Sequence, residues 1–259
     1  MALLHSIISG NGTPVVILHG FLGMADNWKT LGKKWSEHGY EVHLLDQRNH
    51  GRSFHDPVFN YQVMATDLYE YCLHHQLEEI YLLGHSMGGK VAMEFVQQHG
   101  LLVKKLIVAD IAPKPYPAHH GDIFKALRAV DFASITRRNE ANDAMKPLIP
   151  DMGTRQFLLK SLYRTDQKKF GWRFNIDVLG AGQHVVGAHT EQEFNISTPT
   201  LFVRGGDSGY ILDEDLPQIE RLFSNVQLAT IPNAGHWLHA QEPDSFYEIV
   251  SNFMNSEGN

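Results

Sequence analysis

The chain of 259 residues has a single cysteine, Cys72, and so cannot form an internal disulfide. Such sparse cysteine use is typical of a reducing compartment. Positive charge is also scarce. With 22 lysines and arginines against 29 aspartates and glutamates, the formal net charge is -7, which excludes a generally basic surface for nucleic acid or anionic membranes. No apolar run approaches the roughly 20 residues that a membrane-spanning helix needs.

The amino-terminal segment, MALLHSIISG, lacks a basic start, an apolar stretch of signal-peptide length and a small-residue cleavage site. We therefore expect a cytoplasmic protein that neither inserts into membranes nor binds nucleic acid. Hydrophobic residues make up 43% and charged residues 20% of the chain, which is typical of folded globular proteins. The length suits one large domain, with or without an insertion.

Short β-branched apolar runs recur along the chain, at residues 15–18, 42–45, 80–83, 106–109, 200–203 and 227–231. They predict buried strands, and the helical patterns between most of them indicate an α/β fold with a mostly parallel sheet and helices on both faces. No comparable strand occurs between Asp110 and Thr198, and a structureless loop of that length is uncommon in a compact domain. We therefore predict a mainly helical cap at residues 112–197, inserted between core segments 1–111 and 198–259.

Residues 84–88 read Gly-His-Ser-Met-Gly, a G-x-S-x-G motif between a predicted strand and a predicted helix. In that setting the motif is typical of a nucleophile elbow, in which the glycines make room for a strained turn. The elbow would raise the hydroxyl of Ser86 above the carboxyl end of the sheet. There, the amino terminus of the helix favours the negative charge that develops during acyl transfer. Ser86 is thus the predicted nucleophile.

A second pattern overlaps the first, because Gly84-x-x-x-x-Gly89-Lys90 matches a P-loop up to its last position. A P-loop needs serine or threonine there to hold magnesium, and Val91 has no oxygen to offer. Nucleotide hydrolysis is therefore a minor alternative. A non-catalytic receptor for a small molecule on the same scaffold is another, since fold and function can separate.

A serine nucleophile needs a base, and His236 lies in a loop between the last predicted strand and a final helical segment. The chain order of serine and then histidine fits folds that carry the elbow, so His236 is the predicted base. The pairs His74-His75 and His119-His120 are expected to be solvated. No H-E-x-x-H motif or Cys/His cluster indicates zinc, and we expect no metal.

Four segments, LHGF (18–21), DQRNHGRS (46–53), GHSMGG (84–89) and NAGHWLHAQEP (233–243), resemble the α/β-hydrolase family. The stretches VADIAPKPY, QFLLKSLYR with WRFNIDVL, and GGDSGY are most similar to bacterial YbfF-type esterases and related ABHD-type hydrolases. The resemblance implies hydrolysis of small-molecule esters or thioesters with short to medium acyl chains, without metal or organic cofactor. It also implies that the N–H groups of Phe21 and Met87 form an oxyanion hole.

The catalytic acid is where the sequence departs from the common pattern of that family. Many members place an aspartate three residues after a glycine that follows the penultimate strand, and here Ser208 stands in that position. A hydroxyl can orient an imidazole but cannot supply the charge that stabilises imidazolium. Asp110, which ends the strand after the nucleophile helix, is the preferred acid, and the resemblance to YbfF-type enzymes implies this position with Ser208 assisting. Asp207 stays the alternative.

Other predictions concern the surroundings of this site. Trp237 beside the base and His85 beside the nucleophile are expected to contact substrate. A carbon–carbon bond hydrolase or lyase on the same triad is an open alternative, because similarity of fold does not separate it from an esterase. The loop after the second predicted strand is expected to be held by hydrogen bonds from Asp46, Arg48, His50 and Ser53.

Overall fold

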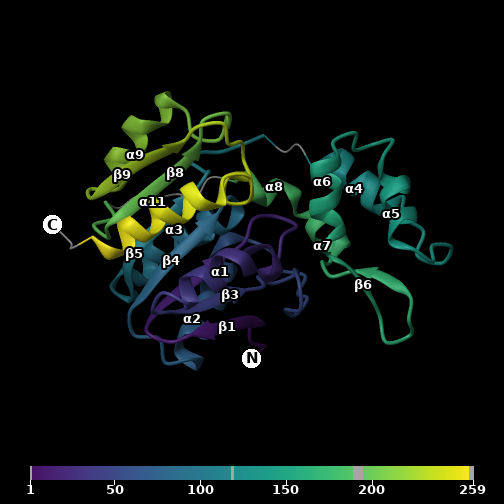
Figure 1. The fold of residues 1–259 in the computed structure, drawn as a ribbon, viewed down its shortest axis with the longest axis horizontal. Coiled ribbons are helices and arrows are strands. Elements are labelled where there is room, and N and C mark those ends of the chain that lie inside the picture. Colours follow the sequence, from purple (N-terminus) through teal and green to yellow (C-terminus); the bar gives the residue numbers. More distant parts are fainter. Residues whose placement is uncertain (1, 118–119, 189–194, 257–259) are drawn as a thin grey trace.

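A seven-stranded sheet forms the centre of the computed structural model, which describes residues 2–117, 120–188 and 195–256 (Figure 1). The strands lie in the order β1-β3-β2-β4-β5-β8-β9, with β1 antiparallel to β3 and the remaining pairs parallel. They are β1 (Ser6–Gly10), β2 (Thr13–Leu18), β3 (Tyr40–Leu45), β4 (Ile80–His85), β5 (Val103–Ala109), β8 (Thr200–Gly205) and β9 (Val226–Ile231). The predicted α/β architecture is confirmed. The antiparallel edge strand β1 was not predicted, because its partly exposed residues form no continuous apolar run.

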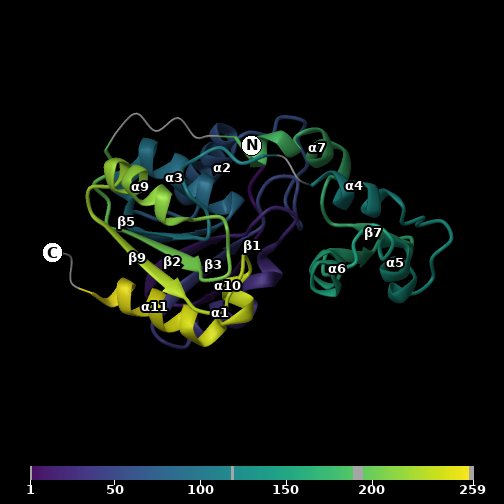
Figure 2. The ribbon, with the colours of Figure 1, turned by 90° about the horizontal axis from the view of Figure 1, so that it is seen from above.

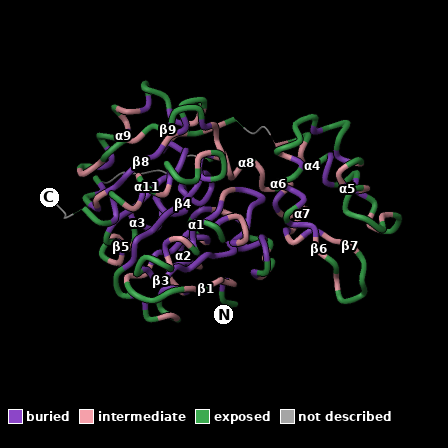
Figure 3. The backbone as a smooth tube through the Cα atoms, viewed as in Figure 1, coloured by how far each residue is buried: buried purple, intermediate pink, exposed green. Residues whose placement is uncertain are grey.

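Helices cover both faces of the sheet, as Figure 2 shows from above. In β2, Val15 and Ile17 join the hydrophobic core under α1 and α11, whereas Val16 and Leu18 join the core under α2, α3 and α9. Burial on both faces explains why the inner strands β2, β3, β4, β5 and β8 read as continuous apolar runs, and Figure 3 shows the strands at the centre of the sheet mostly buried. The helices are α1 (Lys29–Ser36), α2 (Tyr61–His74), α3 (Met87–His99), α9 (Leu216–Leu222), α10 (Leu238–Gln241) and α11 (Pro243–Asn255), with short 3-10 turns at Ala25–Trp28, Gly100–Leu102 and Asp213–Asp215.

The segment between β5 and β8, which we call the cap (residues 112–197), projects beside the core (Figure 1). Its helical character is confirmed in the part of it that the structure describes. The small antiparallel pair of β6 and β7 was not predicted, since strands of three residues are too short to give an alternating pattern. The cap elements are α4 (Gly121–Arg128), α5 (Arg138–Met145), α6 (Met152–Leu159), β6 (Leu162–Arg164), β7 (Phe170–Trp172), α7 (Ile176–Ala181) and α8 (Gln183–Val186).

Lys90, the lysine of the P-loop pattern, joins the cap to the core. Its side chain is fully buried in α3, and burial lowers its pKa to about 8. Nζ donates to the carbonyl oxygen of Lys114 at 2.8 Å and to that of Ala188, which lie at the two ends of the cap. These ends also bond to each other, from the N–H of Tyr116 to the carbonyl oxygen of Gly187 at 2.8 Å. The ammonium group of Lys90, which a P-loop would direct at phosphate, thus donates to main-chain carbonyl groups instead.

The turn between β4 and α3 is too tight for side chains at its two motif glycines. A Cβ atom on Gly84 would lie 2.2 Å from the carbonyl oxygen of Gly88, and one on Gly88 would lie 2.4 Å from the carbonyl oxygen of Leu18. Both contacts are with main chain, which cannot move aside without shifting the sheet. The glycines therefore set how closely α3 approaches β2.

We predict that Gly88→Ala lowers the free energy of unfolding by about 2 kcal/mol or more, because the new methyl group overpacks this turn. Urea unfolding measures the change. The control is Gly121→Ala at the start of α4, where an added Cβ meets no atom within 4 Å. That variant should match the wild type or gain up to about 1 kcal/mol. Equal stability of the two variants would contradict this account of the turn.

Candidate active site

Ser86 lies on the turn where β4 ends and α3 begins. Its backbone has φ 53° and ψ -118°, a conformation that is costly for any residue with a side chain. The residue is 7% exposed, and its hydroxyl borders a cavity above the carboxyl edge of the sheet. This is the geometry that the G-x-S-x-G motif predicted.

Ser86, His236 and Asp110 form one hydrogen-bonded chain. His236 Nε2 lies 3.0 Å from Ser86 Oγ, and His236 Nδ1 lies 2.8 Å from Asp110 Oδ2. The three residues follow β4, β9 and β5, which are parallel strands whose carboxyl ends meet at one edge of the sheet. The topology thus brings a serine, a histidine and an aspartate together from distant parts of the chain.

The carboxylate of Asp110 is fully buried, and polar groups surround it. Oδ1 accepts the N–H of Gly205 at 3.1 Å, and Oδ2 accepts the hydroxyl of Ser208 as well as His236. The backbone of Asp110 has φ 52°, in the left-handed region that residues with side chains seldom adopt. Within the described part of the chain, no lysine or arginine pairs with this carboxylate. The hydroxyl of Ser208 therefore bonds to the carboxylate of Asp110 and not to the imidazole of His236.

The alternative acid, Asp207, is not brought to the histidine. Its side chain is exposed, while its main-chain N–H donates to the carbonyl oxygen of Ala234 at 2.9 Å. Its carboxylate bonds to none of the residues that the structure describes. The one-residue offset from the usual family position thus turns this side chain outward.

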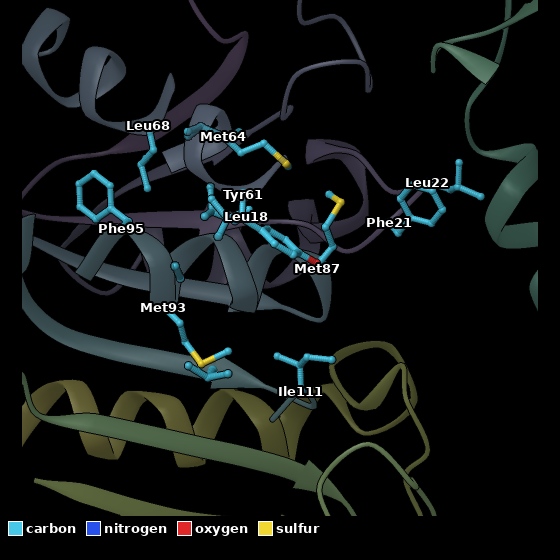
Figure 4. Close-up of a cluster of buried hydrophobic side chains, with 14 of the residues drawn as sticks. Leu18, Phe21, Leu22, Tyr61, Met64, Leu68, Met87, Met93, Phe95 and Ile111 are labelled. Atoms are coloured by element: carbon cyan, nitrogen blue, oxygen red, sulfur yellow. The ribbon is translucent and has the colours of Figure 1, made fainter. Parts of the chain in front are cut away.

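The loop after β2 lies against Ser86 and His85. A Cβ atom on Gly20 would lie only 2.8 Å from Nδ1 of the buried His85 ring, so a glycine suits this approach. The side chains of Phe21 and Met87 belong to the buried apolar cluster drawn in Figure 4. Their main-chain N–H groups have no hydrogen-bond partner among the described residues. Met87 begins α3, where the first N–H groups of a helix have no partner within the helix.

A cavity of about 300 Å³ opens beside Ser86 and is lined by core and cap together. The described lining residues are mostly apolar or aromatic, and none is lysine, arginine, aspartate or glutamate. The core contributes Phe21, Trp28 and Trp237, and the cap contributes Ile123, Phe157 and Leu158, among others.

Both predicted substrate contacts border this cavity. The Trp237 ring packs against Phe157 of α6, with ring centroids 5.6 Å apart. His85 also holds the main chain of His236, because its Nε2 lies 2.8 Å from the main-chain oxygen of His236 and must carry the proton to donate there.

The prediction that the other histidine pairs are solvated was partly wrong. His120 lines the cavity and lies edge-on to Phe21, with ring centroids 5.0 Å apart. His119 lies outside the described residues. His74 is exposed, but His75 is half-buried. Nothing in the local sequence distinguishes His120, since only the fold brings this part of the cap over the core.

The loop after β3 is held by its own polar side chains, which confirms the prediction for Asp46, Arg48, His50 and Ser53. His50 also supports the neighbouring loop that carries Phe21. Its Nε2 accepts the N–H of Leu22 at 3.2 Å, while Nδ1 lies 2.9 Å from the carbonyl oxygen of Arg48. A neutral imidazole with its proton on Nδ1 satisfies both bonds.

Burial keeps several imidazoles around the nucleophile neutral. It lowers the pKa of His19 to about 4 and that of His50 to about 3, and it holds the pKa values of His85 and His239 well below the ordinary range. Neighbouring histidines add to this lowering for His50, His85 and His239. Each group would gain a proton in the unfolded chain at a higher pH than in the folded protein. Their folded pKa values are depressed, so stability is lost as pH falls below about 6.5.

We predict that His50→Gln reduces this acid sensitivity. The unfolded wild type binds a proton at His50 between pH 6.5 and 5, whereas the folded protein does not. The free energy of unfolding of the wild type should therefore fall by about 1.5 kcal/mol more than that of the variant over this interval. Urea unfolding at pH 5.0, 5.5, 6.0 and 6.5 measures the difference. Parallel pH curves for the two proteins would show that His50 is not held neutral.

The described part of the chain contains no cluster of three or more histidine, cysteine, aspartate or glutamate side chains that could bind a metal ion. It also contains no helix that is both long and apolar enough to span a membrane.

A serine on a strand–helix turn bonds to a histidine, which bonds to a buried aspartate, above the carboxyl edge of a parallel sheet. This arrangement is typical of hydrolases with an α/β fold. Residues 13–243 match the model of the α/β-hydrolase fold family. The chain belongs to the α/β-hydrolase family, as the sequence motifs predicted.

Relatives match along almost the whole chain. Esterase YbfF of Escherichia coli is 34% identical over 247 residues, which cover 95% of this chain and 94% of that protein. The sn-1-specific diacylglycerol lipase ABHD11 of Danio rerio is 35% identical and covers 95% of this chain and 79% of that protein. A solved structure of a marine microorganism esterase superposes with a TM-score of 0.94 at 38% identity, covering 98% of this chain and all of that one.

Proposed function

We propose that this protein is a serine carboxylesterase that works through an acyl-enzyme. The observation that carries the proposal is the hydrogen-bonded chain from Ser86 through His236 to Asp110, at the wall of an apolar cavity. Two relatives with names that specify an esterase or a lipase support it.

In the proposed mechanism, Ser86 Oγ attacks the acyl carbon of the ester while His236 Nε2 takes the hydroxyl proton. The N–H groups of Phe21 and Met87 hold the oxyanion that forms on the carbonyl oxygen. His236 then gives the proton to the departing alkoxide or thiolate. Water, deprotonated by the same histidine, hydrolyses the acyl-enzyme and restores the serine.

Asp110 has two roles in this proposal. It holds the proton of His236 on Nδ1, which leaves Nε2 free to accept from the serine, and its charge stabilises the imidazolium. Ser208 assists by donating its hydroxyl to the same carboxylate, which fixes the orientation of Asp110. The buried peptide N–H of Gly205 does the same from the other side.

The cavity favours uncharged esters or thioesters with short to medium acyl chains. About 300 Å³ is at the small end of the range for ligand pockets, and the described lining offers no lysine or arginine to an anionic acyl group. The cap acts in this proposal as the outer wall, because α4 and α6 supply Ile123, Phe157 and Leu158. Neutral p-nitrophenyl butyrate is therefore a suitable probe.

We predict that Ser86→Ala lowers kcat for p-nitrophenyl butyrate by at least about 10⁴-fold, because the nucleophile is removed while the fold is kept. Absorbance of p-nitrophenolate measures the rate. Ser36→Ala, at a half-buried position in α1 that does not line the cavity, is the matched control and should keep the wild-type rate. Hydrolysis by Ser86→Ala at the wild-type rate would refute the proposal.

We predict that Asp110→Asn lowers kcat by about 10⁴-fold, since the neutral amide neither stabilises imidazolium nor fixes its tautomer. Asp207→Asn is the matched control, because it removes a carboxylate from a nearby loop that does not reach His236. It should change kcat by less than about twofold, as expected for an exposed substitution outside the site. A larger loss in Asp207→Asn than in Asp110→Asn would show that the acid is misassigned.

A further inference from the structure

An aromatic ring lies flat against the proposed base. The ring of Tyr210, in the loop after β8, stacks on the imidazole of His236 with centroids 3.8 Å apart and an angle of 16° between the planes. Tyr210 also lines the cavity, so the stack forms part of its wall. The ring of His85 is the other close aromatic neighbour, at 4.9 Å and 40°.

The loop that carries Tyr210 is fixed to Asp110. The main-chain N–H of Tyr210 lies 3.3 Å from Oγ of Ser208, and the hydroxyl of Ser208 in turn donates to Asp110. Its carbonyl oxygen accepts the hydroxyl of Tyr116 at 2.5 Å. Tyr116 also accepts the N–H of Ala112, two residues after the acid, at 2.8 Å. Hydrogen bonds from two sides therefore hold the Tyr210 main chain in register with Asp110.

We propose that Tyr210 is a positioning residue for the base, and that its ring face stabilises the imidazolium form of His236 during proton transfer. This inference rests on the proposed function, in which Ser86 gives its proton to His236. At that moment the imidazole becomes a cation, and the electron-rich face of a tyrosine attracts a cation at this distance. The partly closed site strengthens the attraction, because water screens it less there.

Other groups that face His236 do not replace this effect. Asp110 contacts the Nδ1 edge of the imidazole and supplies the negative charge. His85 and His239 are buried imidazoles with pKa values well below the ordinary range, so they are uncharged near neutral pH. Tyr210 keeps its phenol proton, because burial and the charge of Asp110 raise its pKa. Among these groups, Tyr210 alone places a π face parallel to the base.

The test compares Tyr210→Leu with Tyr210→Phe in hydrolysis of p-nitrophenyl butyrate. The leucine variant removes the ring and should lower kcat about tenfold with little change in KM, since the stack acts on the base and not on the substrate. The phenylalanine variant keeps the ring and should retain at least half of the wild-type kcat. The acid limb of the kcat/KM profile should also move to lower pH in Tyr210→Leu, because imidazolium is less favoured, and should stay in place in Tyr210→Phe.

A matched control exists elsewhere in the chain. Tyr69 of α2 stacks on His99 with centroids 4.0 Å apart and an angle of 5°, away from the cavity. Tyr69→Leu removes an equivalent stack and should leave kcat, KM and the pH profile unchanged. If Tyr210→Leu does not fold by circular dichroism, Tyr210→Met takes its place with the same expected result.

Three outcomes would overturn the inference about Tyr210 and leave the proposed function intact, provided that the wild type hydrolyses the ester and Ser86→Ala does not. One is an unchanged kcat and acid limb in Tyr210→Leu. Another is an equal loss of kcat in the leucine and phenylalanine variants, which would assign the effect to the hydroxyl. The third is a rise in KM without loss of kcat, which would make Tyr210 a substrate contact. A wild type without serine-dependent hydrolysis would instead overturn the proposed function.

Discussion

The site depends on one buried negative charge. Asp110 is fully buried, and a peptide N–H, a serine hydroxyl and the imidazole of His236 solvate its carboxylate. A buried carboxylate without such partners is costly, so the loops after β8 and β9 must converge on the end of β5. The same convergence brings His236 within hydrogen-bond distance of Ser86. The contacts that satisfy the carboxylate of Asp110 thus also place His236 beside Ser86.

Imidazoles in this site differ in their surroundings. His236 has 23% of its side chain exposed and contacts the carboxylate of Asp110. His19, His50 and His85 are buried, and burial lowers their pKa values far enough to keep them neutral. Neutral rings can each accept at one nitrogen and donate at the other, as His19 and His50 do. The fold thus surrounds His236 with rings that stay neutral.

Much of this arrangement could be predicted from sequence because it depends on local patterns. Doubly buried strands give continuous apolar runs, and the elbow at Ser86 needs glycines at fixed spacing. The choice between Asp110 and Asp207 as the acid was harder to make from the sequence, because a shift of one residue decides whether a side chain after a strand faces inward. The stack of Tyr210 on His236 and the place of His120 were missed. Both depend on loops that meet only in the fold, for which a single sequence carries no periodic signal.

The most direct test of the account is to look for the acyl group on the enzyme during turnover. Wild-type protein mixed with a slowly hydrolysed ester is quenched in acid, digested and analysed by mass spectrometry. The account predicts an added acyl mass on the peptide that contains Ser86, which forms and decays with product release. Hydrolysis that proceeds with no acylated peptide, or with the acyl group on another residue, would contradict it.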